Sequence, residues 1–177
     1  SQLFRFRDPS FAEKTPYIYF STPTKTLVYE VFSVFYNDAK IDGGKSLWYI
    51  EPEPGVDYGT LLDTVKERSL YKYDVDVTTS DKILTLSTCT VGFGLQKRGN
   101  YRFVIVAKLV SDTSDLRVKN ASFTINAGAP IPSTFEKTFK DYVANWKPSA
   151  EVVAADPGSV IESSAASSSA SSASASK

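Results

Sequence analysis

Two segments in the middle of the chain alternate apolar and polar side chains with the period of two that is typical of β-strands. Residues 83–88 and 101–110 are also rich in β-branched residues, so each predicts a strand. The connection at 91–100 contains three glycines and an asparagine, which suit a chain that reverses its direction. If the two strands pair antiparallel, Cys89 and Arg102 lie at the same end of the sheet, and a thiol faces a guanidinium.

A second pair of segments, 17–20 and 27–36, predicts a hairpin that turns at 21–25. The longer strand is mostly apolar on both of its faces. One predicted face carries Tyr29, Val31, Ser33 and Phe35, and the other carries Val28, Glu30, Phe32 and Val34. Such a strand is typical of the centre of a sheet that is covered on both sides, as in a barrel.

Helical spacing of apolar residues occurs in two longer segments. Residues 57–70 place Leu61, Leu62, Val65 and Ser69 on one stripe, with Asp57 as a candidate cap. Residues 131–146 begin with a capping box and are followed by Pro148. We expect the apolar stripe of this second helix to pack on the outside of the sheet; a partner-binding helix is the alternative.

The remaining segments predict short elements, a long connection and a tail. Pro9 suits the first turn of a short helix, residues 71–81 predict packed edge structure, and residues 121–126 predict a short strand. The connection at 37–56 contains Trp48 and Tyr49, which predict either simple loop cover or one wall of a substrate groove.

Composition supports one folded, β-rich domain followed by a tail. The 177 residues are 42% hydrophobic and 13% aromatic, and 20 basic residues balance 20 acidic ones, which does not indicate a nucleic-acid partner. A single cysteine cannot form an internal disulfide, and no metal site or cofactor is predicted. No apolar run reaches the roughly 18 residues that a membrane-spanning helix needs.

The run Thr85-Leu86-Ser87-Thr88-Cys89, with Arg102 on the following strand, resembles the TLxTC motif and the arginine strand of sortases, which are bacterial cysteine transpeptidases. Residues 15–19, TPYIY, and 69–71, SLY, make the resemblance strongest to class B, and it covers roughly residues 4–111. The resemblance implies a mostly β, sortase-like β-barrel, with an inserted helix before the Cys strand and here an additional C-terminal helix. The resemblance assigns residues 1–111 to the C-terminal portion of a catalytic domain. The residue patterns beyond it predict an extension with a short strand and an amphipathic helix (112–147) and a disordered Ser/Ala-rich tail (148–177).

One departure from the family pattern is decisive for activity. Sortases use a histidine, and this chain contains none. In the family that histidine lies just upstream of the segment that residues 1–11 resemble, so we expect a truncated or incomplete sequence that is inactive as written; a natural pseudoenzyme is the alternative. The resemblance also implies a location on the bacterial cell surface, with an N-terminal membrane anchor that is absent from this chain.

The chemistry of a sortase assigns roles to four residues. Cys89 is the candidate nucleophile, because a thiolate attacks a carbonyl readily, although a free thiol is only a few per cent ionised at neutral pH. Arg102 is the candidate for stabilising negative charge, since a guanidinium donates hydrogen bonds and is a poor base. Ser87 and Thr88 are candidates for orienting the substrate backbone, with Thr88 favoured because it adjoins Cys89.

Three functions remain open from the sequence. The first is a sortase that cleaves a sorting motif in surface proteins, holds it as a thioester on Cys89, and passes it to an amine of cell-wall peptidoglycan or of a pilin. The second is a catalytically inactive, sortase-like module that binds the sorting-motif peptide. An unrelated β-rich surface domain is the third, and it would be favoured if Cys89 were fully buried and far from Arg102.

Overall fold

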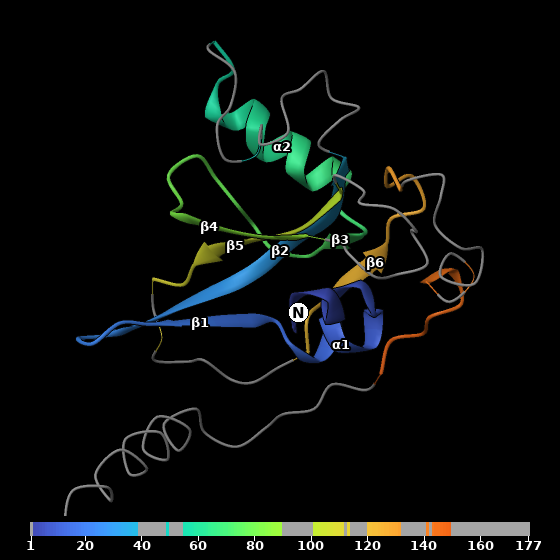
Figure 1. Ribbon diagram of the computed structural model, residues 1–177, viewed down its shortest axis with the longest axis horizontal. Helices are drawn as coiled ribbons and strands as arrows, with labels where there is room; N and C mark the ends of the chain where they lie inside the picture. The colour runs from blue at the N-terminus through green and yellow to red at the C-terminus, as the bar shows by residue number, and fades with distance from the viewer. Residues whose placement is uncertain are drawn as a thin grey trace, which may run out of the picture.

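A curved antiparallel sheet forms the centre of the chain (Figure 1). The computed structural model describes residues 2–38, 49, 55–89, 101–111, 113, 120–131, 141 and 143–149. The sheet has the strand order β1-β2-β5-β4. Its strands are β1 (Tyr17–Ser21), β2 (Thr26–Asp38), β4 (Ile83–Cys89) and β5 (Tyr101–Leu109). The four predicted strands are therefore confirmed, and the sheet curls into half of a barrel.

Strand β2 has covered faces, as predicted, but its alternation is broken. Its pairing with β5 shifts between Val31 and Ser33, which is a β-bulge. As a result Val31 and Val34 pack in one hydrophobic cluster, whereas Phe32 and Phe35 pack in another. The prediction that Val31 and Phe35 share a face is wrong, because the extra residue of the bulge moves the following side chains to the opposite face.

Helix α2 (Tyr58–Arg68) covers one face of the sheet (Figure 1). Asp57 caps it by accepting a hydrogen bond from the amide of Thr60 at 3.0 Å, so the predicted helix and its cap are both confirmed. Leu62 and Val65 are buried against the sheet, and the Ser33 hydroxyl donates to the carbonyl of Val65 at 2.6 Å. This contact fixes the helix over the middle of β2.

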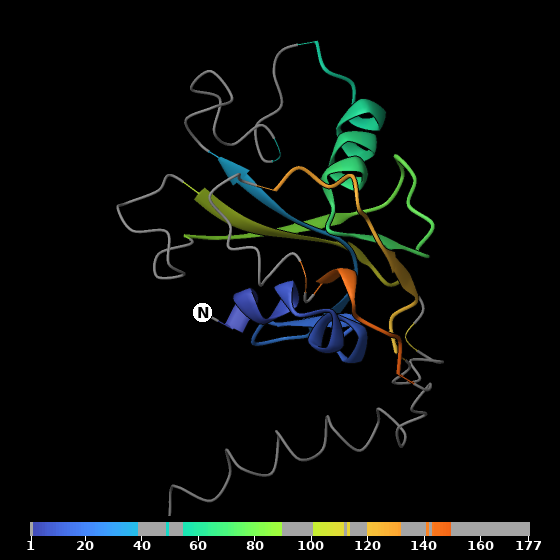
Figure 2. The same ribbon diagram turned by 90° about the vertical axis from the view of Figure 1, so that its right-hand side faces the viewer.

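The other face is covered by the N-terminal elements, as Figure 2 shows with the sheet lying between them and α2. These are the 3-10 helix η1 (Gln2–Arg7) and α1 (Pro9–Lys14), which Asp8 caps. Phe4 of η1 stacks on Phe103 of β5 with ring centroids 5.7 Å apart. The predicted short helix at Pro9 is confirmed, and it contributes to the larger hydrophobic cluster.

A second, two-stranded sheet joins the middle of the chain to its C-terminal part. Strand β3 (Tyr71–Tyr73) pairs antiparallel with β6 (Phe123–Ile125), so the predicted short strand is confirmed. Of the predicted helix at 131–146, only Ile131, Asp141 and residues 143–146 are among those described, and Asp141, Val143 and Ala144 are helical. Trp146 stacks on Phe123 at 4.8 Å, which agrees with packing against the body of the protein.

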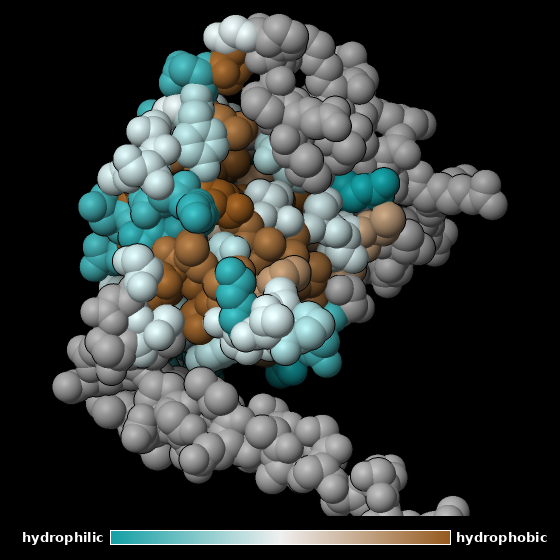
Figure 3. All heavy atoms as spheres, turned by 90° about the vertical axis from the view of Figure 1, so that its left-hand side faces the viewer, coloured by the Kyte–Doolittle hydropathy of each residue, from teal (hydrophilic) through white to brown (hydrophobic). Residues whose placement is uncertain are grey.

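Several predicted segments lie outside the described residues, namely the loop at 91–100, most of the connection at 37–56 and the tail from residue 150. Among the described residues, no helix combines the length and apolar character needed to cross a membrane. Hydrophobic side chains are visible in the middle of the face that Figure 3 presents, with hydrophilic ones around them. Among the residues that the structure describes, the large hydrophobic ones that are exposed are Tyr19, Phe20, Val56 and Tyr58.

Candidate active site

Cys89 and Arg102 meet at one end of the sheet. They are direct partners in the antiparallel register of β4 and β5, and Nη1 of Arg102 donates a hydrogen bond to Sγ of Cys89 at 3.0 Å. Cys89 is exposed and Arg102 is half-buried. The prediction that Cys89 and Arg102 lie together at one end of an antiparallel pair is confirmed. A fully buried Cys89 far from Arg102 would have favoured an unrelated β-rich domain, and neither condition holds.

A third polar residue extends this row across the sheet. Asn37 of β2 is the register partner of Arg102, and its side chain is fully buried. The row Asn37, Arg102, Cys89 therefore runs from the interior of the sheet to its exposed edge strand. Cross-strand partners place their side chains on the same face, so the guanidinium lies between a buried amide and an exposed thiol.

Ser87 lies on the same face of β4 as Cys89, two residues away, and is exposed. Its hydroxyl is hydrogen-bonded to the hydroxyl of Tyr49 at 3.1 Å. Tyr49 is 4% exposed and packs edge-to-face against Phe35, with ring centroids 5.7 Å apart. Tyr49 thus joins the connection at 37–56 to the cysteine strand, and the aromatic pair at 48–49 was the sequence signal for it.

Thr88 is placed differently from Ser87. Because side chains alternate along a strand, the Thr88 side chain lies on the opposite face of β4 from Cys89. Its register partner is Phe103, which is fully buried in the cluster that η1 and α1 cover. The backbone of Thr88 still adjoins Cys89, but its hydroxyl is on the far side of the sheet.

A hollow of about 360 Å³ lies between α2 and the strands on the cysteine face. Ile83 and Thr85 belong to its lining, and they share a face of β4 with Ser87 and Cys89. The lining is mostly apolar and consists of Tyr49, Tyr58, Leu61, Leu62, Val65, Ile83, Thr85 and Val106. An apolar hollow therefore follows the same strand face that ends at the thiol.

Comparison with known proteins identifies relatives of this chain. No protein-family model matches the chain. Sortase B of Staphylococcus aureus is 34% identical over 103 residues, which are 57% of this chain and 38% of that protein. Sortase B of Listeria monocytogenes is 29% identical over 113 residues, 63% of this chain and 42% of that protein. The matched part thus spans about two fifths of each of these relatives.

A solved structure agrees with the sequence relatives. Sortase B of Clostridium perfringens superposes with a TM-score of 0.50 at 30% identity, covering 62% of this chain and 56% of that one. The chain is a homologue of class B sortases. The predicted resemblance and the sortase-like, mostly β fold are therefore confirmed, whereas the roles of the four site residues remain predictions.

The electrostatics of this sortase-like site depend on few groups. Among the described residues, no group of three or more Asp, Glu, Cys or His side chains could hold a metal ion. Burial, together with the negative charge of Asp81, raises the pKa of Tyr58 at the hollow, so this phenol stays neutral. On the opposite face burial raises the pKa of Tyr36 to about 12, although Arg7 acts to lower it. Among the described residues, Arg102 is the charged group that is hydrogen-bonded to the thiol.

Proposed function

We propose that this chain carries the nucleophilic half of a sortase-type cysteine transpeptidase. The observation that supports it is the 3.0 Å hydrogen bond from Arg102 to the exposed Cys89, in a chain homologous to sortase B. A charge-assisted hydrogen bond stabilises negative charge on sulfur and points a guanidinium at the place where an acyl group would bind. We place the protein at the bacterial cell surface, as its homology suggests.

The reaction has two steps. In the first, the sulfur of Cys89 bonds to the carbonyl carbon of a sorting-motif peptide, and Arg102 stabilises the oxyanion of the tetrahedral intermediate. Collapse of that intermediate breaks the C–N bond, releases an amine and leaves a thioester. In the second step an acceptor amine attacks the thioester carbon, forms a new amide and returns the electron pair to the sulfur of Cys89.

Turnover requires proton transfers that the formation of an adduct at the thiol does not. The leaving amine needs a proton and the attacking amine must lose one, tasks that the family resemblance assigns to a histidine. None of the 177 residues is a histidine. We therefore expect this sequence to form covalent adducts at Cys89 with reactive peptide analogues, but not to turn over unless a proton donor is supplied.

The substrate groove that we propose follows β4 from Cys89 toward α2. The exposed Ser87, held by Tyr49, offers a hydroxyl to the substrate backbone beside the thiol, while the apolar hollow accepts a side chain further along. This geometry favours the Ser87 hydroxyl over that of Thr88. Structures of sortase B exist with triglycine and, for the S. aureus protein, as a substrate complex, and we propose ligands of the same kind for this chain.

Intact-mass spectrometry tests the proposal. The chain is incubated with peptide chloromethyl ketones built on sorting-signal sequences, and a single adduct is expected that maps to Cys89 and is absent from Cys89→Ser. A scrambled peptide with the same reactive group is the matched control. Equal labelling by the sorting and the scrambled peptides would show an exposed thiol without a substrate site, and no adduct with any of them would contradict the proposal.

A non-catalytic peptide-binding module is the second candidate, and the absence of histidine from the sequence favours it. It predicts that unreactive sorting peptides bind with the same affinity to the wild type and to Cys89→Ser. It also predicts that added imidazole produces no transfer to glycine amide. A transfer product in the presence of imidazole, lost in Cys89→Ser, would support the transpeptidase and reject the module.

A further inference from the structure

A second hollow lies at the opposite end of the sheet from Cys89. Its volume is about 340 Å³. Glu30, on its wall, is paired with Lys108 in the register of β2 and β5, six residues along β5 from Arg102, or about 20 Å. The lining consists of Glu13, Pro16, Glu30, Val31, Asp74, Val75, Asn120, Ala121, Ser122, Phe123, Trp146, Pro148 and Ser149. It is therefore separate from the cysteine site and draws on five distant parts of the chain.

The walls of this hollow are joined by backbone hydrogen bonds. The amide of Val31 donates to the carbonyl of Pro16 at 2.8 Å, and that of Asp74 donates to Ser122 at 2.8 Å. On another side the amide of Ala121 donates to the carbonyl of Glu13 at 2.6 Å. Since every wall is tied to another, the hollow is formed in advance of any ligand.

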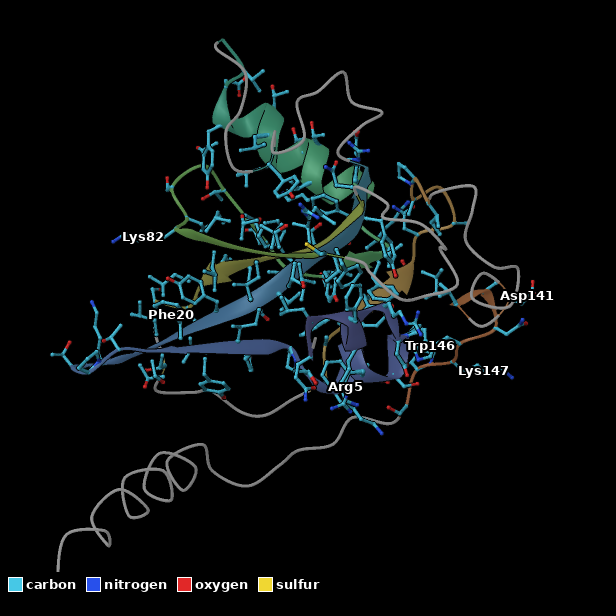
Figure 4. All side chains as sticks on the ribbon, in the orientation of Figure 1. Arg5, Phe20, Lys82, Asp141, Trp146 and Lys147 are labelled. Atoms are coloured by element: carbon cyan, nitrogen blue, oxygen red, sulfur yellow. The ribbon has the colours of Figure 1, made fainter. Side chains whose placement is uncertain are left out.

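The C-terminal segment 143–149 closes the hollow against α1. Ser149 donates twice to the carboxylate of Glu13, through its amide at 2.9 Å and its hydroxyl at 2.7 Å. Figure 2 shows this segment beside α1, and Figure 4 shows Trp146 next to α1 while its neighbour Lys147 points outward. The buried Glu13 thus holds the closing segment, and other carboxylates are left to face a ligand.

Charge on the lining has one sign. The carboxylates of Glu30 and Asp74 line the hollow without a hydrogen-bond or ion-pair partner among the described residues. No lysine or arginine is among the described residues that line it, and Lys108, the register partner of Glu30, donates its ammonium to the carbonyl of Asp76 instead. The carboxylates do not converge as metal ligands, because no metal-binding group occurs among the described residues.

The remaining lining is aromatic and aliphatic. Trp146 stacks on Phe123 with ring centroids 4.8 Å apart and an interplanar angle of 17°, and its indole N–H is buried without a partner among the described residues. Val31 and Val75 add aliphatic surface. Tryptophan is the aromatic ring that attracts cations best, and a lysine side chain combines an ammonium with a four-carbon apolar stem.

We propose that this hollow binds a lysine side chain presented by a partner peptide. The ammonium meets the carboxylates of Glu30 and Asp74, and the stem lies against Trp146 and the valines. This assignment goes beyond the proposed transpeptidase function and does not depend on it, because neither Cys89 nor Arg102 contributes to the hollow.

The test is a titration with N-acetyl-L-lysine methylamide, followed by the NMR indole N–H signal of Trp146, which is assigned by its loss in Trp146→Phe. We expect a saturable shift that N-acetylnorleucine methylamide, the uncharged analogue, does not reproduce. The double variant Glu30→Gln, Asp74→Asn is expected to weaken binding at least tenfold. Asp63→Asn, Glu67→Gln removes two exposed carboxylates on α2 and is the matched control with unchanged affinity.

Four results would overturn the proposal. They are the absence of a saturable shift, an equal shift with the norleucine compound, equal affinity in the two double variants, and the same shift with calcium chloride alone. The Glu→Gln and Asp→Asn substitutions are nearly isosteric, and circular dichroism of every variant, Trp146→Phe included, establishes that the fold is retained before the titrations are compared.

Discussion

The two ends of the central sheet are built in different ways. At one end, Arg102 and Cys89 are neighbours because β4 and β5 follow each other in the chain and pair in register. At the other end, Glu13 and Ser149, which are hydrogen-bonded, stand 136 positions apart. The first end therefore depends on the pairing of two consecutive strands, whereas the second depends on the docking of distant segments. Substitutions at the two ends should consequently affect different properties, thiol chemistry at one and stability at the other.

The largest effect is expected at the cysteine end. Replacing Arg102 by Ala should slow adduct formation at Cys89 with a sorting-peptide chloromethyl ketone by about a hundredfold, the usual loss when a single oxyanion-stabilising donor is removed. Arg102→Lys keeps the charge but loses the guanidinium fork, so we expect an intermediate rate. The rates are measured by intact mass at fixed pH.

Lys108→Ala is the matched control for this prediction, because it removes one positive charge from the same face of β5 at the far end of the strand. It should leave the labelling rate unchanged. Equal rates for Arg102→Ala and the wild type would mean that the 3.0 Å contact is structural and does not assist the thiol.

The difference between the two ends of the sheet also explains which features the sequence could predict. The strands around Cys89 and Arg102 were predictable, because alternation and a glycine-rich connection are local signals. The orientation of the Thr88 side chain was predictable too, since neighbouring side chains in a strand face opposite ways. Its adjacency to Cys89 in the sequence nevertheless made Thr88 the favoured candidate over Ser87. Ser87 is the residue that shares the exposed face with the thiol.

Other features left no local signal. The bulge near Phe32 depends on how β2 pairs with β5, so a regular period of two misplaced Val31 relative to Phe35. The pairing of β3 with β6 joins segments about 50 residues apart, and the hollow beside Trp146 exists only after that pairing and the docking of 143–149. Contacts at such separation are set by tertiary packing rather than by the pattern of either segment.

At the far end of the sheet, Trp146→Ala should lower the free energy of unfolding by about 2 kcal/mol, because a stacked, half-buried aromatic side chain is lost. Trp146→Phe keeps a ring on Phe123 and should recover much of the loss. Chemical denaturation measures both. The labelling rate of Cys89 in the folded protein should not change, and a parallel fall would show that the two ends are coupled.

Glu13→Gln tests the same docking of residues 143–149 against α1, and its expected effect on stability is smaller. Glu13 is 3% exposed, and its carboxylate accepts two hydrogen bonds from Ser149. Glutamine removes the negative charge that strengthens both hydrogen bonds, and the Ser149 hydroxyl must then accept from the new NH₂ group, so we expect a loss of about 1.5 kcal/mol. Ser149→Ala removes only the hydroxyl donor and should cost less. A larger loss in Ser149→Ala than in Glu13→Gln would contradict the assigned hydrogen bonds.

The smallest effect concerns the cap of α2, the helix that covers the cysteine face. Hydrogen bonds from the hydroxyl and amide of Thr60 lower the pKa of Asp57 below its ordinary value of 3.8. Because the pKa is lowered in the folded state, the ionised carboxylate of Asp57 stabilises the fold above pH 3.8. This stabilisation is lost as the pH falls through the folded-state pKa.

Asp57→Asn keeps a good capping residue but has no charge to lose. The wild type should therefore have the higher denaturation midpoint at pH 7, and the difference should shrink as the pH falls through the folded-state pKa of Asp57, because the carboxyl is then protonated in both states. Denaturant melts of the two proteins across this range measure the gap. A constant gap at every pH would mean that the charge of Asp57 contributes nothing to the stability of the helix over the candidate site.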